Sequence, residues 1–149
     1  MRLALEEARR AYEIREVPIG AVVVMDGNVI SRAHNLRETE NDPTAHAELL
    51  AIRQASQVLK RWRLNGCILY CTIEPCAMCA GALVLSRIDT LVFGANDAKA
   101  GACGSVMNIV QHPALNHRVE VIAGILADEC SALMRKFFSE MRTEGCRSG

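Results

Sequence analysis

The stretch "CILYCTIEPCAMCAGALVLS" (residues 67–86) decides the class of fold, because it leads a strand directly into a helix. Residues 67–73 form an apolar run, as expected for a strand that is covered on both faces of its sheet. Pro75 favours the first turn of a helix, and small and apolar residues continue this helix to Ser86. A buried strand followed at once by a helix predicts an α/β fold.

The rest of the chain alternates between strands and helices. Asp26-Gly27 predicts a hairpin, because this dipeptide favours the tight turn between two antiparallel strands. The other predicted elements are a helix over 3–16, two strands within 20–33, a helix capped by Thr44 and running to about 60, a strand over 90–95, a short helical piece over 105–111, a strand over 119–124 and a closing helix over 128–142. This order predicts a three-layer α/β/α sandwich around a mixed sheet.

Length and composition restrict the class of protein. The chain has 149 residues, half of them hydrophobic, so we expect a single domain over residues 1–149 with a buried core. No apolar run approaches the ~18 residues of a membrane span. The N-terminal segment has no uninterrupted apolar core, which argues against a secretory signal, and its glutamates argue against an organelle transit peptide. We therefore expect a cytoplasmic protein. The formal net charge is zero, so any surface that binds RNA must be local.

Cys76 and Cys79 are candidate metal ligands. They lie three residues apart at the start of the predicted helix, so their sulfur atoms share one face. The free N–H groups and partial positive charge of a helix N-terminus favour thiolate over thiol, and thiolates bind zinc. A thioredoxin-like redox pair and two small buried residues are the alternatives. A redox pair, however, would leave a second motif in the chain without a function.

This second motif is "PTAHAELLA" (residues 43–51), in which His46 and Glu48 begin another predicted helix. Residues two apart on a helix point away from each other, so these two can act together only beyond the end of the helix. His46 adds a third ligand to Cys76 and Cys79. Three protein ligands are typical of a catalytic zinc site, in which one position stays open to water. Glu48 would reach this water.

The order H-x-E…P-C-x-x-C is the signature of zinc nucleobase deaminases, in which the glutamate carries protons and is not a ligand. From residue 8 to 142 the chain also resembles the bacterial tRNA-specific adenosine deaminases, for example in "NDPTAHAELLAIRQ", "LYCTIEPCAMCAGALVLSRI" and "VFGANDAKAG". The resemblance implies the cytidine-deaminase-like fold, a five-stranded mixed sheet flanked by helices. It also implies a homodimer with one Zn²⁺ per subunit that converts the wobble adenosine of a tRNA anticodon stem-loop to inosine.

The resemblance gives roles to seven residues. It implies that Asn35 holds the purine, that the backbone N–H of Ala47 meets the base edge, and that Asp97 lies near the flanking nucleotide. The full set consists of the zinc ligands His46, Cys76 and Cys79, the proton shuttle Glu48, and the substrate-binding residues Asn35, Ala47 and Asp97. The resemblance gives no role to Cys67, Cys71, Cys103, Cys130 or Cys146. Burial as small residues is the default interpretation of these five cysteines.

Two other functions stay open. A free-base or nucleoside deaminase acting on guanine or cytosine has the same zinc signature. A non-catalytic, zinc-stabilised RNA-binding subunit is the second alternative, and such a subunit can dispense with the glutamate that this chain keeps as Glu48. His34 is a rival fourth ligand, although a closed site with four protein ligands would abolish the chemistry.

Some basic and aromatic residues are candidates for RNA contact. The cluster "KRWR" (residues 60–63) is interpreted as a solvated helix end, with RNA contact as the alternative. The resemblance places Lys99 and Arg118 near the loops that approach RNA. Phe137 and Phe138 belong to the core by default, and stacking of one of them on a base is the alternative.

Overall fold

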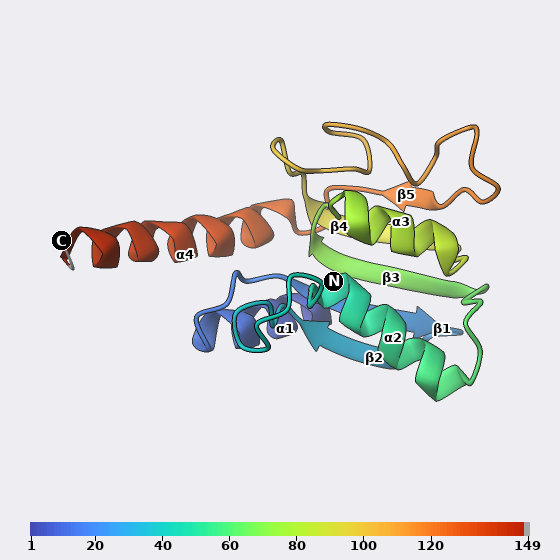
Figure 1. Cartoon of the computed structure of the whole chain (residues 1–149), viewed down its shortest axis with the longest axis horizontal. Helices are drawn as coiled ribbons and strands as arrows, with labels where there is room; N and C mark the ends of the chain where they lie inside the picture. Colours follow the sequence, from blue (N-terminus) through green and yellow to red (C-terminus); the bar gives the residue numbers. More distant parts are fainter. Residues whose placement is uncertain (148–149) are drawn as a thin grey trace.

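The computed structural model describes residues 1–147, in which five strands form one mixed sheet (Figure 1). The strands are β1 (Gly20–Met25), β2 (Asn28–His34), β3 (Cys67–Ile73), β4 (Thr90–Ala95) and β5 (Glu120–Ile122). Their order across the sheet is β2-β1-β3-β4-β5. β1 is antiparallel to β2 and β3, whereas β3, β4 and β5 are parallel to one another. The predicted mixed sheet of five strands is confirmed.

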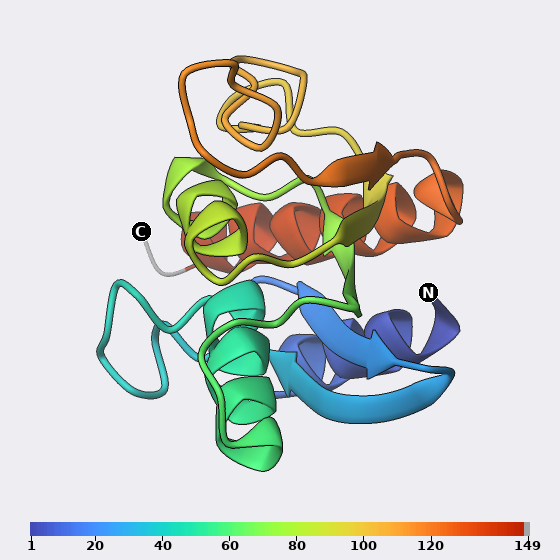
Figure 2. The ribbon, with the colours of Figure 1, turned by 90° about the vertical axis from the view of Figure 1, so that its right-hand side faces the viewer.

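The helices cover both faces of this sheet. They are α1 (Arg2–Glu13), α2 (Ala47–Leu59), α3 (Ala77–Leu85) and α4 (Ala127–Arg147). α1 and α4 contact each other and lie on one face, while α2 and α3 lie together on the other (Figures 1 and 2). The three-layer α/β/α sandwich is therefore confirmed. The expected single domain over 1–149 includes residues 148–149, which lie outside the described residues.

The main core lies between β3 and the layer formed by α2 and α3. Cys67, Leu69 and Cys71 alternate along β3 and are fully buried on this side. The opposite face of β3 contacts α1 and α4, so the strand is covered on both sides as its apolar sequence predicts. On the α1 side, a Cβ atom at Gly20 would lie 2.1 Å from the carbonyl oxygen of Ala4, so glycine permits the close approach of α1.

Asp26 and Gly27 form the two-residue turn between β1 and β2. Their backbone φ angles are 51° and 75°, and Met25 pairs with Asn28 across the turn. Positive φ at both central residues suits the right-handed twist of the two strands. The predicted hairpin is confirmed.

The C-terminal half of α4 extends past the strands (Figure 1). It is joined to the end of α1 by a hydrogen bond from Tyr12 to Glu140 and by an ion pair between Arg15 and Glu144. The ring of Phe137 packs edge-on against Tyr12, with 6.2 Å between the ring centres. These contacts hold α4 beside α1. Within the described part of the chain, no helix is both long and apolar enough to cross a membrane.

Two predicted helix starts are wrong by a few residues. His46, and not Thr44, is the N-cap of α2, because the Thr44 hydroxyl and N–H are both bonded to Asp42, at 2.7 and 2.8 Å. A threonine engaged in this turn is unavailable to cap a helix. Cys76 is the N-cap of α3, one residue after Pro75. Each correction moves a candidate zinc ligand to the very end of its helix.

The short helix predicted over 105–111 is also wrong. This segment is irregular, and residue 108 forms an isolated bridge with Cys103. Its backbone N–H groups do not follow the i→i−4 spacing of an α-helix: Val106 and Met107 both donate to the carbonyl of Gly101, five and six residues earlier. At the other predicted elements the bounds differ by a few residues, and β5 is limited to Glu120–Ile122.

Candidate active site

The N-termini of α2 and α3 position the candidate zinc ligands. His46 and Cys76 are the N-cap residues of these two neighbouring helices, and both have extended backbone conformations. Neither side chain makes a capping hydrogen bond to its own helix. Instead, the two side chains approach each other between the two helix ends. Cys79 lies one turn into α3 and is fully buried.

The three ligand atoms are close together. Nδ1 of His46 lies 3.8 Å from Sγ of Cys76 and 3.6 Å from Sγ of Cys79. In a tetrahedral zinc site the usual Zn–N and Zn–S lengths place nitrogen and sulfur about 3.6 Å apart. His46, Cys76 and Cys79 thus fit zinc, and all three ligand atoms lie within 4.8 Å of one another. When bound, zinc acts as a Lewis acid that makes a water nucleophile available at neutral pH.

The electrostatics of the two thiols suit a metal site. Hydrogen bonds from Cys79 and with His46 lower the pKa of Cys76 to about 3. The same bond to Cys76, together with burial, raises the pKa of Cys79. The bond to Cys76 also raises the pKa of His46. The low pKa of Cys76 favours the thiolate that a metal needs, and a metal that bound both sulfur atoms would displace the proton of Cys79.

Glu48 lies beside the ligands in the first turn of α2. Its Oε2 is 3.4 Å from Sγ of Cys79, and only 3% of the residue is exposed. Burial raises the pKa of this carboxyl, which brings it closer to the range in which an acid both accepts and donates protons near neutral pH. Glu48 shares a small cavity with His46. This cavity of about 70 Å³ is lined by Val17, Ile19, Asn35, Arg37, His46, Ala47 and Glu48.

Asn35 and Ala47 line the same cavity as the histidine and the glutamate. Asn35 follows β2 directly and is 5% exposed. Its Oδ1 accepts a bond from the N–H of Arg37 at 3.2 Å, and its Nδ2 donates to the carbonyl of Val17 at 3.3 Å. These bonds fix the orientation of the amide. The structure thus brings six of the seven predicted residues together around this cavity and its adjacent thiols.

Asp97, the seventh, lies in the wall of a second and larger cavity of about 600 Å³. Its Oδ1 accepts bonds from the N–H groups of Lys99 and Ala100, at 3.0 and 3.1 Å, which fix a turn after β4. The two cavities share Val17, Ile19 and Arg37. Asp97 is therefore placed at the mouth of the site and not beside the ligands.

Arg37 is a site residue that the sequence analysis missed. It lines both cavities and its side chain is about half exposed, so it places a positive charge where the small cavity meets the large one. A signal was available, because Arg37 stands two residues after Asn35 in "HNLRE". Only the path of the loop after β2, however, brings it to this position.

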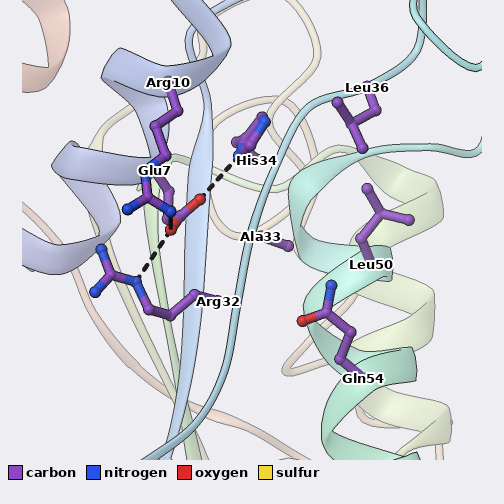
Figure 3. A pocket seen from close by; sticks show the side chains of 8 residues that line it. All are labelled: Glu7, Arg10, Arg32, Ala33, His34, Leu36, Leu50 and Gln54. Carbon is purple, nitrogen blue, oxygen red and sulfur yellow. Dashed lines mark hydrogen bonds and ion pairs between the residues drawn. The ribbon is translucent and has the colours of Figure 1, made fainter.

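His34 belongs to a different cavity (Figure 3). Its Nδ1 lies 2.8 Å from Oε2 of Glu7, a buried carboxylate that also accepts bonds from Arg10 and Arg32, at 2.9 and 3.0 Å. This cavity of about 430 Å³ does not include His46. His34 is therefore not a fourth zinc ligand in this arrangement.

The other candidate RNA contacts fall in several places. Lys99 and Phe138 line the large cavity, whereas Phe137 is buried against Tyr12. The cluster at 60–63 follows α2 at its C-terminal end. The 13 residues of α2 span about 20 Å, so this cluster lies far from the ligands at the other end. Stacking of Arg63 on exposed Trp62 agrees with the interpretation as a solvated helix end.

Comparisons with known proteins agree with this geometry. A histidine and two cysteines beside a buried glutamate form the constellation of the zinc nucleobase deaminases. The model of the MafB19-like deaminase family matches residues 1–142. The fold and the site therefore define the chain as a deaminase.

The relatives narrow this class. The tRNA-specific adenosine deaminase of Bacillus subtilis (strain 168) is 53% identical over 142 residues, which cover 95% of this chain and 88% of that protein. The chain therefore belongs to the family of tRNA-specific adenosine deaminases. A structure from studies of A-to-I editing by tRNA:A34 deaminases at the wobble position of transfer RNA has a TM-score of 0.86 and 47% identity, covering 89% of this chain and 96% of that chain.

A similar but more distant structure is that of the guanine deaminase from Nitrosomonas europaea. It has a TM-score of 0.76 and 26% identity, and covers 90% of this chain and 80% of that chain. The fold thus also resembles that of an enzyme for a free base.

Proposed function

We propose that this chain is a zinc-dependent, cytoplasmic enzyme that hydrolyses the wobble adenosine of a tRNA anticodon to inosine and releases ammonia. Residues 1–149 would form its single deaminase domain, with one Zn²⁺ per subunit. The observation that carries the proposal is the buried carboxylate of Glu48, 3.4 Å from Cys79 and in one cavity with His46 and Asn35. The high identity to curated tRNA-specific adenosine deaminases supports the choice of substrate.

The positions of the site residues support one role for each. His46, Cys76 and Cys79 would hold the ion. Glu48 takes a proton from the attacking water and delivers it to N1 of adenine, which makes C6 more electrophilic. The oxygen of this water then bonds to C6, and Glu48 carries the remaining proton of the added hydroxyl group to the amino nitrogen. The C6–N bond breaks, ammonia leaves and C6 becomes the carbonyl carbon of inosine. Asn35, whose amide is fixed by two bonds, holds the purine in the cavity.

The larger cavity suits the nucleotides around the target base. Arg37, Lys99 and Arg135 bring positive charge to its wall, and Phe138, a residue that is 42% exposed, lines the same cavity. Positive side chains bind phosphates, and exposed aromatic rings stack on unpaired bases. An anticodon loop presents such bases, because they are already free of a duplex and cost little to unstack.

We expect ammonia release and inosine formation from an anticodon stem-loop with adenosine at the wobble position. The matched substrate has guanosine at that position and should release none. Free guanine and cytosine are tested in parallel, since the resemblance to a guanine deaminase favours a free base as the second candidate. Turnover of the free bases with none of the stem-loop would reject the proposed substrate.

We also propose that the chain forms a homodimer through α3. Met78 and Leu85 lie seven residues apart on this helix and therefore share one face. They are 37% and 70% exposed, so this face presents apolar side chains to solvent. An apolar helix face without a cover is typical of a subunit interface.

The Leu85→Lys variant should be a monomer at concentrations at which the parent chain is a dimer. A buried lysine at an apolar interface weakens association by about tenfold or more. Sedimentation velocity measures the change. Val29→Lys is the matched control, because Val29 is also an exposed apolar residue (45%) but lies on edge strand β2. Dimers of both variants, or a monomeric parent, would contradict the proposed interface.

A further inference from the structure

Glu74 holds the loop that follows β4. Glu74 stands between the end of β3 and the start of α3, and only 3% of the residue is exposed. Its Oε1 accepts a bond from the N–H of Asp97 at 3.1 Å and another from the hydroxyl of Ser105. Its Oε2 accepts bonds from the N–H groups of Cys103 and Ser105, at 3.0 and 3.1 Å. One carboxylate thus receives four hydrogen bonds from a single loop.

The backbone of this loop packs directly on the carboxylate. A Cβ atom at Gly101 would lie 2.4 Å from Oε2 of Glu74 and 2.5 Å from the carbonyl oxygen of Asp97, so only glycine fits here. The N–H of Ala102 donates to the carbonyl of Pro75 at 2.9 Å. Residues 97–105 contain no helix or strand. The four bonds to Glu74 add to the turn bonds of Asp97 and tie both ends of this segment to the chain between β3 and α3, so we expect the shape of the loop to depend on them.

The same loop forms one wall of the large cavity. Residues 96–99 line it, and Lys99 supplies one of its positive charges. Glu74 itself lines neither this cavity nor the small one. It is therefore placed to act on substrate only through the loop that it holds.

We propose that Glu74 is a positioning residue, which keeps Asp97 and Lys99 at the mouth of the site so that they meet the nucleotides around the target base. This inference rests on the proposed function. An ionised carboxylate only accepts hydrogen bonds, whereas an amide in its place turns an NH₂ group toward N–H donors. Glutamine at position 74 keeps the size of the side chain but leaves loop donors without a partner, so the loop loosens.

The test is the Glu74→Gln variant of the full, zinc-loaded chain. We expect hydrogen exchange of the backbone amides at 97, 103 and 105 to accelerate by about tenfold or more, because these amides lose their acceptor. KM for the anticodon stem-loop should rise about tenfold, while kcat at saturating RNA stays within about threefold of the parent. Zinc analysis should still give one ion per chain.

Two further variants make the test specific. Ser105→Ala removes one of the four bonds, so it should shift loop exchange and KM in the same direction by a smaller factor. Glu7→Gln is the matched control: Glu7 is also a buried carboxylate with several polar partners, but it contacts Arg10, Arg32 and His34. It should keep the parent's loop exchange and KM. If the Glu74→Gln variant does not fold, the loop exchange and KM of Ser105→Ala alone test the inference.

Parent-like loop exchange and KM in the folded variants at positions 74 and 105 would overturn the inference. Loss of zinc from Glu74→Gln without a change in loop exchange would overturn it as well, because Glu74 would then act on the metal site. A drop in kcat at unchanged KM would argue for a role in the chemistry. Failure of the proposed function would give a different result. The parent itself would release no ammonia from RNA, independent of the hydrogen-exchange rates of the loop amides.

Discussion

Deamination by the Glu48→Gln variant is expected to be about 10²–10⁴-fold slower than by the parent, since this is the usual contribution of a positioned acid–base group. The glutamine side chain fills the same buried space but cannot take up and release a proton. Inosine formation in single turnover, with enzyme in excess over an anticodon stem-loop, measures this step directly because it excludes product release.

The variant should keep one zinc ion per chain and bind the stem-loop with the parent's affinity, because Glu48 is not one of the three ligands. Glu40→Gln is a suitable control, since it removes an exposed carboxylate from the loop before α2. Turnover of Glu48→Gln at the rate of the parent would mean that another group shuttles the proton. The non-catalytic RNA-binding alternative would gain support only if the parent, too, were inactive.

The Cys76→Ser variant should lose both zinc and activity, with deamination reduced by more than about 10³-fold. Hydrogen bonds with Cys79 and His46 lower the pKa of Cys76 to about 3, which favours the thiolate form that binds zinc. A serine hydroxyl stays protonated near neutral pH and is a poor zinc ligand. Metal analysis after dialysis and the inosine assay give the two readouts.

Chelator treatment of the parent should reproduce this loss, and added zinc should restore the parent but not Cys76→Ser. Cys146→Ser is the matched control, because Cys146 is an exposed thiol near the end of α4. It should retain full zinc and full activity. A Cys76→Ser protein that holds one zinc ion and deaminates normally would show that the ligand set is wrong.

Much of the fold could be predicted because its signals are local. The apolar run of β3, the small residues of α3 and the Asp26-Gly27 turn each determine their conformation through their own side chains. The ligands could be predicted for a related reason. A histidine and two cysteines at helix starts lie at fixed points of the backbone, so their positions follow once the two helices share a layer.

The features that were missed depend on contacts between distant segments. The helix predicted over 105–111 does not form, because the N–H of Ser105 bonds to Glu74, 31 residues earlier in the chain. Thr44 has a side chain that could cap a helix, but its hydroxyl and its N–H both donate hydrogen bonds to the carboxylate of Asp42. Arg37 reaches the site only through the path of its loop. No spacing rule within the sequence reports such contacts.

The placement of the candidate ligands at the starts of two different helices links metal binding to the stability of the fold. His46 and Cys76 are 30 positions apart, so a metal that joined them would also close a long loop of chain. Because such a site rarely exists in the unfolded chain, the free energy of metal binding would add to the stability of the fold. A ligand that binds only the native state shifts the folding equilibrium toward that state. In a cell short of zinc, the protein would therefore be less stable as well as inactive.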